Sequence, residues 1–141
     1  MNDIINAAFI QFKPAIADVE ANFAQVEKQL NQLKPATELV VLPELAFTGY
    51  NFATGQDILP FAESISSSKT LEFLHAQARK HDIFIVAGFP EVDNTQKQLI
   101  YNSSMLVGPE GLVGTYRKVH LFGNEKNIFA PGDKFKVFDV K

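Results

Sequence analysis

Two runs of consecutive apolar residues, 39–42 and 83–87, limit the fold more than any other feature of the sequence. A strand with one solvated face alternates apolar and polar residues, whereas a continuous apolar run is typical of a strand covered on both faces. Residues 7–12 form a third apolar run, which ends before Pro14. These runs therefore predict three strands of one buried sheet.

The segments between these runs have the periodicity of amphipathic helices. From residue 18 to Pro35, apolar residues recur at steps of three and four: Val19, Phe23, Val26, Leu30 and Leu33. A second helix is expected after the serines at 66–68, with an inner side formed by Leu71, Leu74 and Ala78. Strands that alternate with helices predict right-handed crossovers and a largely parallel sheet, so the expected fold class is α/β.

The last third of the chain has a different pattern. Residues 99–107 and 112–118 flank the tight-turn signature Gly108-Pro109-Glu110-Gly111 and predict an antiparallel hairpin. Residues 135–140 predict one more strand. Two helices cannot cover both faces of such a sheet, so we expect a large apolar face that more chain or another subunit covers.

The composition is that of one soluble globular domain, with 46% hydrophobic and 21% charged residues. A net charge of -3 provides no basic field for nucleic acid. The sequence has neither a signal-peptide pattern nor an apolar run of membrane-spanning length, so we expect a cytoplasmic protein without a membrane partner. The three histidines lack metal-ligand spacing, and the absence of cysteine excludes disulfides and thiol chemistry by this chain alone.

Glu44 is the first candidate for chemistry, because it follows the second apolar run directly after Leu42 and Pro43. Open α/β sheets bind their ligands at the carboxyl ends of strands, and a carboxylate among apolar neighbours suits a general base. The alternative is a loop glutamate in water. Position alone does not decide between these two interpretations.

Lys118 and Glu125 are weaker candidates from the residues alone. Strand alternation from Tyr116 to Phe122 would place Lys118 on a face of mixed character, which suits a pocket wall where an ammonium stabilises an oxyanion. Spacing by itself favours an ordinary surface cluster of basic residues. A solvated loop is likewise the favoured interpretation of Glu125, which lies in a turn-rich segment.

Together, these segments resemble the nitrilase superfamily of carbon-nitrogen hydrolases. The family's glutamate motif is matched by residues 42–50, its lysine motif by residues 116–122, and its second glutamate and aromatic-x-Pro-Gly tail by Glu125 and residues 129–133. The connecting framework is matched at residues 87–89, 101–103 and 108–111. The match runs in order along nearly the whole chain without a large gap, so the resemblance is highly specific.

The resemblance implies a role for each motif residue. Glu44 would be the general base, Lys118 the cation that stabilises the tetrahedral intermediate, and Glu125 a second carboxylate that positions substrate and lysine. Tyr50 would line the substrate pocket. In this family a cysteine thiolate attacks an amide or nitrile carbon and water later releases the acid, without a metal or organic cofactor. We therefore expect Glu44 and Lys118 to meet in one cleft shielded from water.

The resemblance also implies what the chain does not carry. The family's cysteine follows a later strand, so residues 1–141 would be the amino-terminal part of a single domain, truncated before the nucleophile. The expected architecture is half of an α-β-β-α sandwich. The resemblance implies a small-molecule amide or nitrile substrate, a homo-oligomeric enzyme and no turnover by this chain alone. The alternative is a non-catalytic half-sandwich that acts in self-association.

Overall fold

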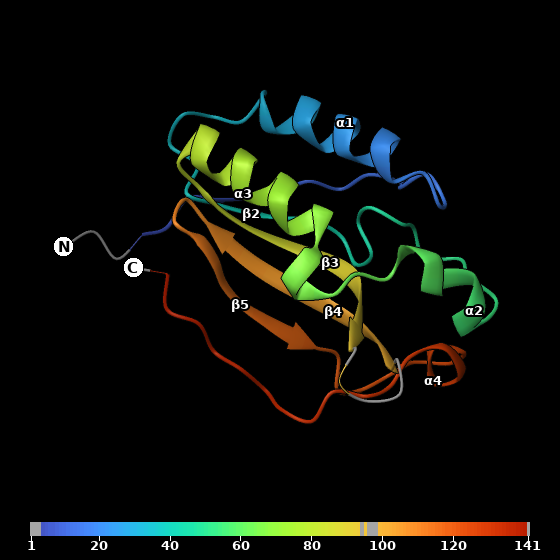
Figure 1. Ribbon diagram of the computed structural model, residues 1–141. Helices are drawn as coiled ribbons and strands as arrows, with labels where there is room; N and C mark the ends of the chain where they lie inside the picture. The colour runs from blue at the N-terminus through green and yellow to red at the C-terminus, as the bar shows by residue number, and fades with distance from the viewer. Residues whose placement is uncertain (1–3, 94, 96–98, 141) are drawn as a thin grey trace.

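The computed structural model describes residues 4–93, 95 and 99–140 and has an α/β fold built on one mixed sheet (Figure 1). Within these residues the sheet has five strands in the order β1-β2-β3-β4-β5. In chain order they span Ala7–Phe9, Leu39–Val41, Phe84–Asp93, Leu99–Gly108 and Gly111–Arg117. β1, β2 and β3 are parallel, whereas β4 is antiparallel to both β3 and β5. The predicted parallel sheet and the hairpin that follows it are confirmed.

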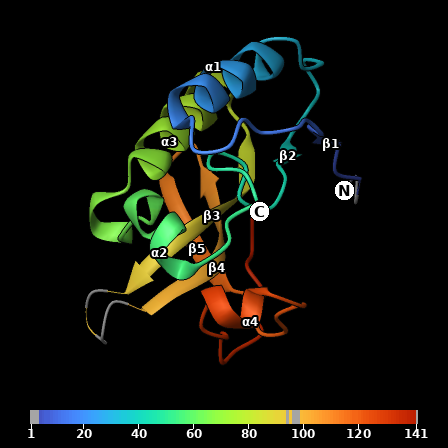
Figure 2. The ribbon, with the colours of Figure 1, turned by 90° about the vertical axis from the view of Figure 1, so that its right-hand side faces the viewer.

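Two helices, α1 (Val19–Leu30) and α3 (Lys69–His81), lie side by side on one face of the sheet (Figures 1 and 2). Asp18 caps α1 by accepting a hydrogen bond from the Ala21 amide at 3.0 Å. Ser68 caps α3 in the same way, through the Leu71 amide at 2.9 Å. Such caps satisfy amide groups that have no partner inside the helix. Both predicted helices are confirmed, although α1 ends three residues before the predicted limit.

The described residues also form four short helical segments that the sequence pattern does not predict. They are α2 (Gly55–Ile58), η1 (Leu59–Phe61), η2 (Ile65–Ser67) and α4 (Glu125–Ile128). A single turn is too short to show a repeating apolar stripe, so periodicity cannot detect it. α4 nevertheless matters for function, because Glu125 is its first residue.

The hydrophobic core lies between the two long helices and the sheet. Phe23 of α1 stacks on Phe73 of α3, with ring centroids 4.4 Å apart, and Phe47 packs against Phe23 at 4.8 Å. Aliphatic residues of both layers fill the rest of this space: Val26, Leu30, Val40, Leu74, Ala78, Ile85, Ala87, Met105 and Val107. Removal of this much apolar surface from water is the main force that holds the helices on the sheet.

The opposite face of the sheet is covered by neither α1 nor α3 (Figure 2). Strand register places Phe9, Val41, Val86 and Leu106 in one row across this face. Phe9 is 77% exposed and Val41 is 40% exposed. The expected uncovered apolar face is therefore present at its β1–β2 side.

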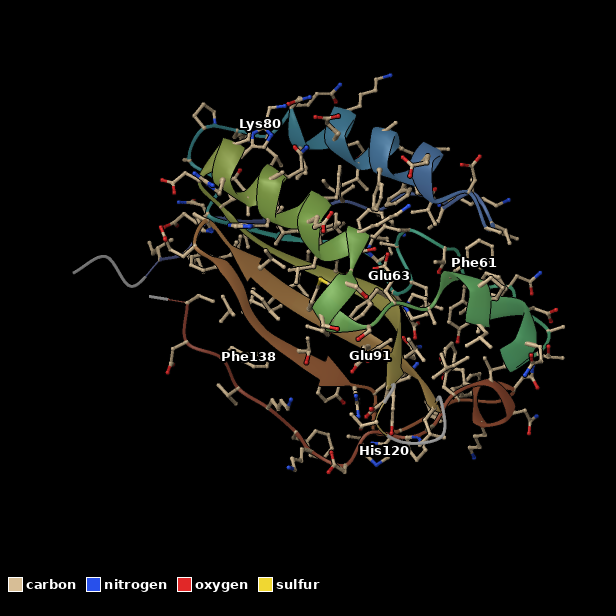
Figure 3. All side chains as sticks on the ribbon, viewed as in Figure 1. Phe61, Glu63, Lys80, Glu91, His120 and Phe138 are labelled. Atoms are coloured by element: carbon tan, nitrogen blue, oxygen red, sulfur yellow. The ribbon has the colours of Figure 1, made fainter. Side chains whose placement is uncertain are left out.

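The segment from residue 131 to residue 140 runs along β5 as an irregular chain (Figure 1). Phe138 lies against Gly114 of β5, where a side-chain carbon on the glycine would approach Phe138 Cε1 to 2.2 Å (Figure 3). Lys136 Nζ donates to the Thr115 carbonyl at 2.8 Å. The predicted strand at residues 135–140 is therefore wrong, because alternating apolar residues form a strand only where a neighbouring strand supplies ladder hydrogen bonds.

Candidate active site

Glu44 is held at the end of β2 by a close contact between two backbone segments. The Gly88 amide donates to the Pro43 carbonyl at 3.3 Å, and the Ala46 amide donates to the Gly88 carbonyl at 3.0 Å. A side-chain carbon at Gly88 would lie 2.8 Å from Glu44 Cα, so only glycine allows this approach. Leu45 adopts the left-handed region, with φ 46°, which is unusual for a residue other than glycine. A strained residue next to a candidate base is common at functional sites.

Lys118 follows the last residue of β5 and is placed by the pairing of β4 with β5. Ser103 faces Arg117 in the register, and the Lys118 amide donates to the Asn102 carbonyl at 2.9 Å. The Gly132 amide in turn donates to the Lys118 carbonyl at 2.8 Å. β5 ends at Arg117, so the predicted strand alternation as far as Phe122 is wrong, and Phe122 is 82% exposed.

Glu125 is buried, and the interpretation of a solvated loop is wrong for this residue. Its Oε2 accepts a hydrogen bond from the Phe122 amide at 2.6 Å. The turn is anchored by Phe129, which is buried in a second apolar cluster with Leu45 and Ile58. Packing at one end of the turn therefore fixes a carboxylate at the other end.

The three predicted residues meet in one charged cluster. Lys118 Nζ lies 2.9 Å from Glu44 Oε1 and 3.0 Å from Glu125 Oε1. Asn102 Nδ2 donates to the same two oxygens, at 3.0 Å in the case of Glu125. We call Glu44, Asn102, Lys118 and Glu125 the carboxylate–lysine cluster.

Asn102 is the member of this cluster that sequence reasoning missed. The sequence marks it only as part of the framework match at residues 101–103. Its proximity to Lys118 follows from the β4–β5 register, in which Ser103 pairs with Arg117. Because the two strands are antiparallel, Asn102, the residue before Ser103, faces Lys118, the residue after Arg117. A correct register for the predicted hairpin would have been the signal that brings these residues together.

The electrostatics of the cluster favour its charged form. Burial raises the pKa of Glu125, but hydrogen bonds from the Phe122 amide, the Lys118 ammonium and the Tyr50 hydroxyl outweigh burial and lower this pKa to about 2. Burial lowers the pKa of Lys118, but its hydrogen bonds to Glu44 and Glu125 outweigh that effect and raise the pKa. Glu125 and Lys118 are therefore both ionised at neutral pH.

Tyr50 joins the cluster through Glu125, to which its hydroxyl is hydrogen-bonded. Burial, this hydrogen bond and the nearby carboxylates raise the pKa of Tyr50 to about 12, so the phenol stays protonated. Its side chain is 50% exposed and does not line the pocket described next. The role of Tyr50 as a wall of the substrate pocket stays a prediction.

A pocket of about 180 Å³ opens beside the cluster on the uncovered face of the sheet. Its lining includes Glu44, Asn102, Lys118, Gly88, Ser104 and Tyr116. The Glu44 side chain is 41% exposed and that of Lys118 is 30% exposed, whereas that of Glu125 is 5% exposed. The expected contact between Glu44 and Lys118 is present, but the expected shielding from water is not, because both side chains remain partly exposed.

A second charged cluster lies on the other face of the same strands, and its Glu91 is near the N-terminal end of α3 (Figure 3). Glu91 accepts hydrogen bonds from Arg117 and, at 2.6 Å, from the Ser103 hydroxyl. Arg117 also contacts Asp93 at 3.1 Å and lies 3.9 Å above the centre of the Tyr101 ring. We call these residues the arginine cluster.

The described part of the chain contains no group of three or more histidine, cysteine, aspartate or glutamate side chains that could hold a metal ion. None of its helices is long and apolar enough to cross a bilayer.

Comparison with known proteins identifies the family. Residues 6–141 match the family model described as carbon-nitrogen hydrolase. The match covers nearly the whole sequence, in agreement with the motif order and with the fold. The chain therefore belongs to the carbon-nitrogen hydrolase family, within the nitrilase superfamily.

Individual relatives agree with this assignment and differ in length from the chain. A nitrilase of Pyrococcus abyssi is 42% identical over 97% of this chain and 52% of its own length. An (R)-stereoselective amidase of a Pseudomonas species is 34% identical over 89% of this chain and 44% of its own length. The crystal structure of Saccharomyces cerevisiae Nit3, a member of branch 10 of the nitrilase superfamily, superposes with a TM-score of 0.82 at 30% identity, covering 97% of this chain and 52% of that one. The chain spans about half the length of the curated relatives it matches.

Proposed function

We propose that this chain supplies the base and the electrostatic groups of a cysteine-dependent amide or nitrile hydrolase. The observation that carries the proposal is the position of the Lys118 ammonium, within 3.0 Å of both Glu44 Oε1 and Glu125 Oε1. Glu44 lies 74 residues before Lys118 in the sequence, yet the fold brings it to the Lys118–Glu125 pair beside a pocket. Such groupings of ionisable side chains are typical of functional sites. Family membership supports carbon-nitrogen bond hydrolysis as the class of reaction.

The two carboxylates are held differently, and this difference suggests separate roles. Both oxygens of Glu125 accept hydrogen bonds, and its pKa of about 2 keeps it ionised. Only Oε1 of Glu44 accepts hydrogen bonds from the described residues, so Oε2 has none of these donors. An oxygen without a donor on a partly exposed carboxylate is the better proton acceptor. Glu44 is therefore the base, and Glu125 is a fixed anion that holds Lys118.

The proposed reaction needs a thiol that this chain does not contain. Glu44 Oε2 takes the proton of a cysteine supplied by a segment outside the 141 residues. The thiolate then attacks the amide or nitrile carbon and forms the bond that later becomes the acyl-enzyme. The Lys118 ammonium stabilises the negative charge that develops on the attacked group. Protonated Glu44 gives its proton to the leaving nitrogen, so that an amide releases an amine or ammonia and leaves a thioester. A nitrile first gives a thioimidate, which one water converts to the thioester and ammonia; a further water then hydrolyses the thioester to the acid and the thiol.

A chimera provides the test. The chain is joined in frame to the remaining half of the Pyrococcus abyssi nitrilase, and ammonia release is measured with a substrate that the parent enzyme hydrolyses. We expect activity from the chimera and none from the 141-residue chain alone. Glu44→Gln should lower kcat by roughly 10²–10⁴-fold, because the amide cannot accept the thiol proton.

Glu110→Gln is the matched control, because Glu110 lies exposed in the turn between β4 and β5. Circular dichroism and a melting curve establish that each protein is folded. A folded chimera without activity would contradict the proposal. Control-level activity of Glu44→Gln would contradict the assignment of the base.

A further inference from the structure

Asn102 occupies a position between the two carboxylates that no other neutral side chain shares in the described residues. It is only 4% exposed. Its Nδ2 donates to Glu44 Oε1 and to Glu125 Oε1, the two atoms that Lys118 Nζ also contacts. Each of these two Oε1 atoms is thus held by one charged and one neutral donor.

The chemistry of the amide suits this position. Two carboxylates and one ammonium leave the cluster with one excess negative charge, so the carboxylates repel each other. An amide nitrogen carries two hydrogen atoms and no charge, so it can donate to both oxygens without a change in this balance. A buried donor of this kind also removes the cost of leaving carboxylate oxygens without partners.

The backbone of Asn102 is fixed independently of its side chain. It pairs with Pro90 of β3, and its carbonyl accepts the Lys118 amide at 2.9 Å. These ladder contacts direct the side chain towards the uncovered face, where Lys118 and Glu44 lie. Replacement of the side chain therefore leaves the strand pairing in place and removes only the donors.

We propose that Asn102 is a positioning residue, which holds the Glu44 and Glu125 carboxylates together on Lys118 and orients Glu44 so that its free oxygen faces the attacking thiol. This inference rests on the proposed function, because it concerns the same base and the same cation. Asn102 acts on the reaction through Glu44 and does not touch the reacting atoms.

The test uses the chimera described above. Asn102→Leu keeps the size of the side chain but removes both of its hydrogen-bond donations. Because Glu44 would then be misplaced, kcat should fall by roughly 10–100-fold with little change in KM. Loss of donors to ionised carboxylates makes the cluster bind a proton more readily, so the acid limb of the pH–rate profile should move to higher pH. Asn102→Asp adds a third carboxylate and should move this limb further. A purely structural role would lower stability without a shift of the pH profile.

Asn102→Ser and Asn31→Leu complete the experiment. The serine variant keeps one donor and should lose less activity than Asn102→Leu, and it replaces the leucine variant if that protein does not fold. Asn31 is exposed at the end of α1, so Asn31→Leu should leave kcat and the pH profile unchanged. Folded Asn102 variants with the kcat and pH profile of this control would overturn the inference. If Glu44→Gln is inactive in the same series, the proposed function still stands; if Glu44→Gln is active, both proposals fail.

Discussion

Arg117 and Lys118 are neighbours in the sequence but lie on opposite faces of the sheet, and each binds a pair of carboxylates. Arg117 donates through two nitrogens to Glu91 and Asp93 and is stacked on Tyr101. Lys118 contacts Glu44 and Glu125 through a single Nζ. A planar guanidinium fits a rigid, packed network, whereas an ammonium is a compact charge beside an open pocket. The comparison shows how one strand end supports both the fold and the candidate site.

Of the substitutions that test the difference between Arg117 and Lys118, Lys118→Met in the chimera should have the largest effect. Loss of a fixed cation at the developing negative charge should lower kcat by roughly 10²–10³-fold. The side chain is 30% exposed, so the free energy of unfolding should change less than it does for the arginine discussed next. Steady-state kinetics and urea denaturation measure the two quantities. Lys126→Met, at an exposed position of α4, is the matched control. An unchanged kcat would contradict the claim that Lys118 serves the reaction whereas Arg117 supports the fold.

Arg117→Met should mainly lower the free energy of unfolding, which is measured in the 141-residue chain. It leaves Glu91, whose side chain is 7% exposed, without its cation, and removal of one partner of a buried pair costs about 3 kcal/mol. Urea denaturation of the variant and the wild type gives this difference directly. A loss below about 0.5 kcal/mol, the usual limit for surface substitutions, would show that the arginine cluster does not support the fold.

The dependence of stability on acid pH should differ between Glu125 and an exposed glutamate. The pKa of Glu125 is lowered to about 2 in the folded chain, below its value in the unfolded chain. Its contribution to stability is therefore complete above about pH 5, is lost progressively as the pH falls through 4.5, and is gone below about pH 2. Urea midpoints between these pH values should fall less steeply for Glu125→Gln than for the wild type. Glu110→Gln serves as the control, and identical slopes for Glu125→Gln and wild type would contradict the pKa shift.

The smallest expected effect concerns the uncovered face itself. We expect the 141-residue chain to self-associate through this face, where Phe9 is 77% exposed. Phe9→Asp should lower the associated fraction in sedimentation velocity. Phe122→Asp is the control, since Phe122 is equally exposed in the loop before α4 rather than on the sheet. A monomeric wild-type chain would contradict the expectation.

Long periodic segments were predictable from sequence, and contacts between distant segments were not. Helix α3 was anticipated with its Ser68 cap, because caps and apolar stripes are local signals. The residues alone favour a solvated loop for Glu125, because its burial depends on Phe129 packing in a distant cluster. Asn102 was overlooked, because its role depends on hairpin register. The family motifs supplied Glu44, Lys118 and Glu125 as candidates, but only the structure shows Lys118 in contact with both carboxylates.

The most direct measurement is the titration of Lys118 in the 141-residue chain by NMR of ¹³Cε-labelled lysine. If two carboxylates bind this ammonium, its pKa lies above the ordinary value of a lysine side chain and falls in both Glu44→Gln and Glu125→Gln. Lys118→Met assigns the resonance. Titration of Lys118 together with the exposed lysines, unaffected by either variant, would contradict the existence of the carboxylate–lysine cluster.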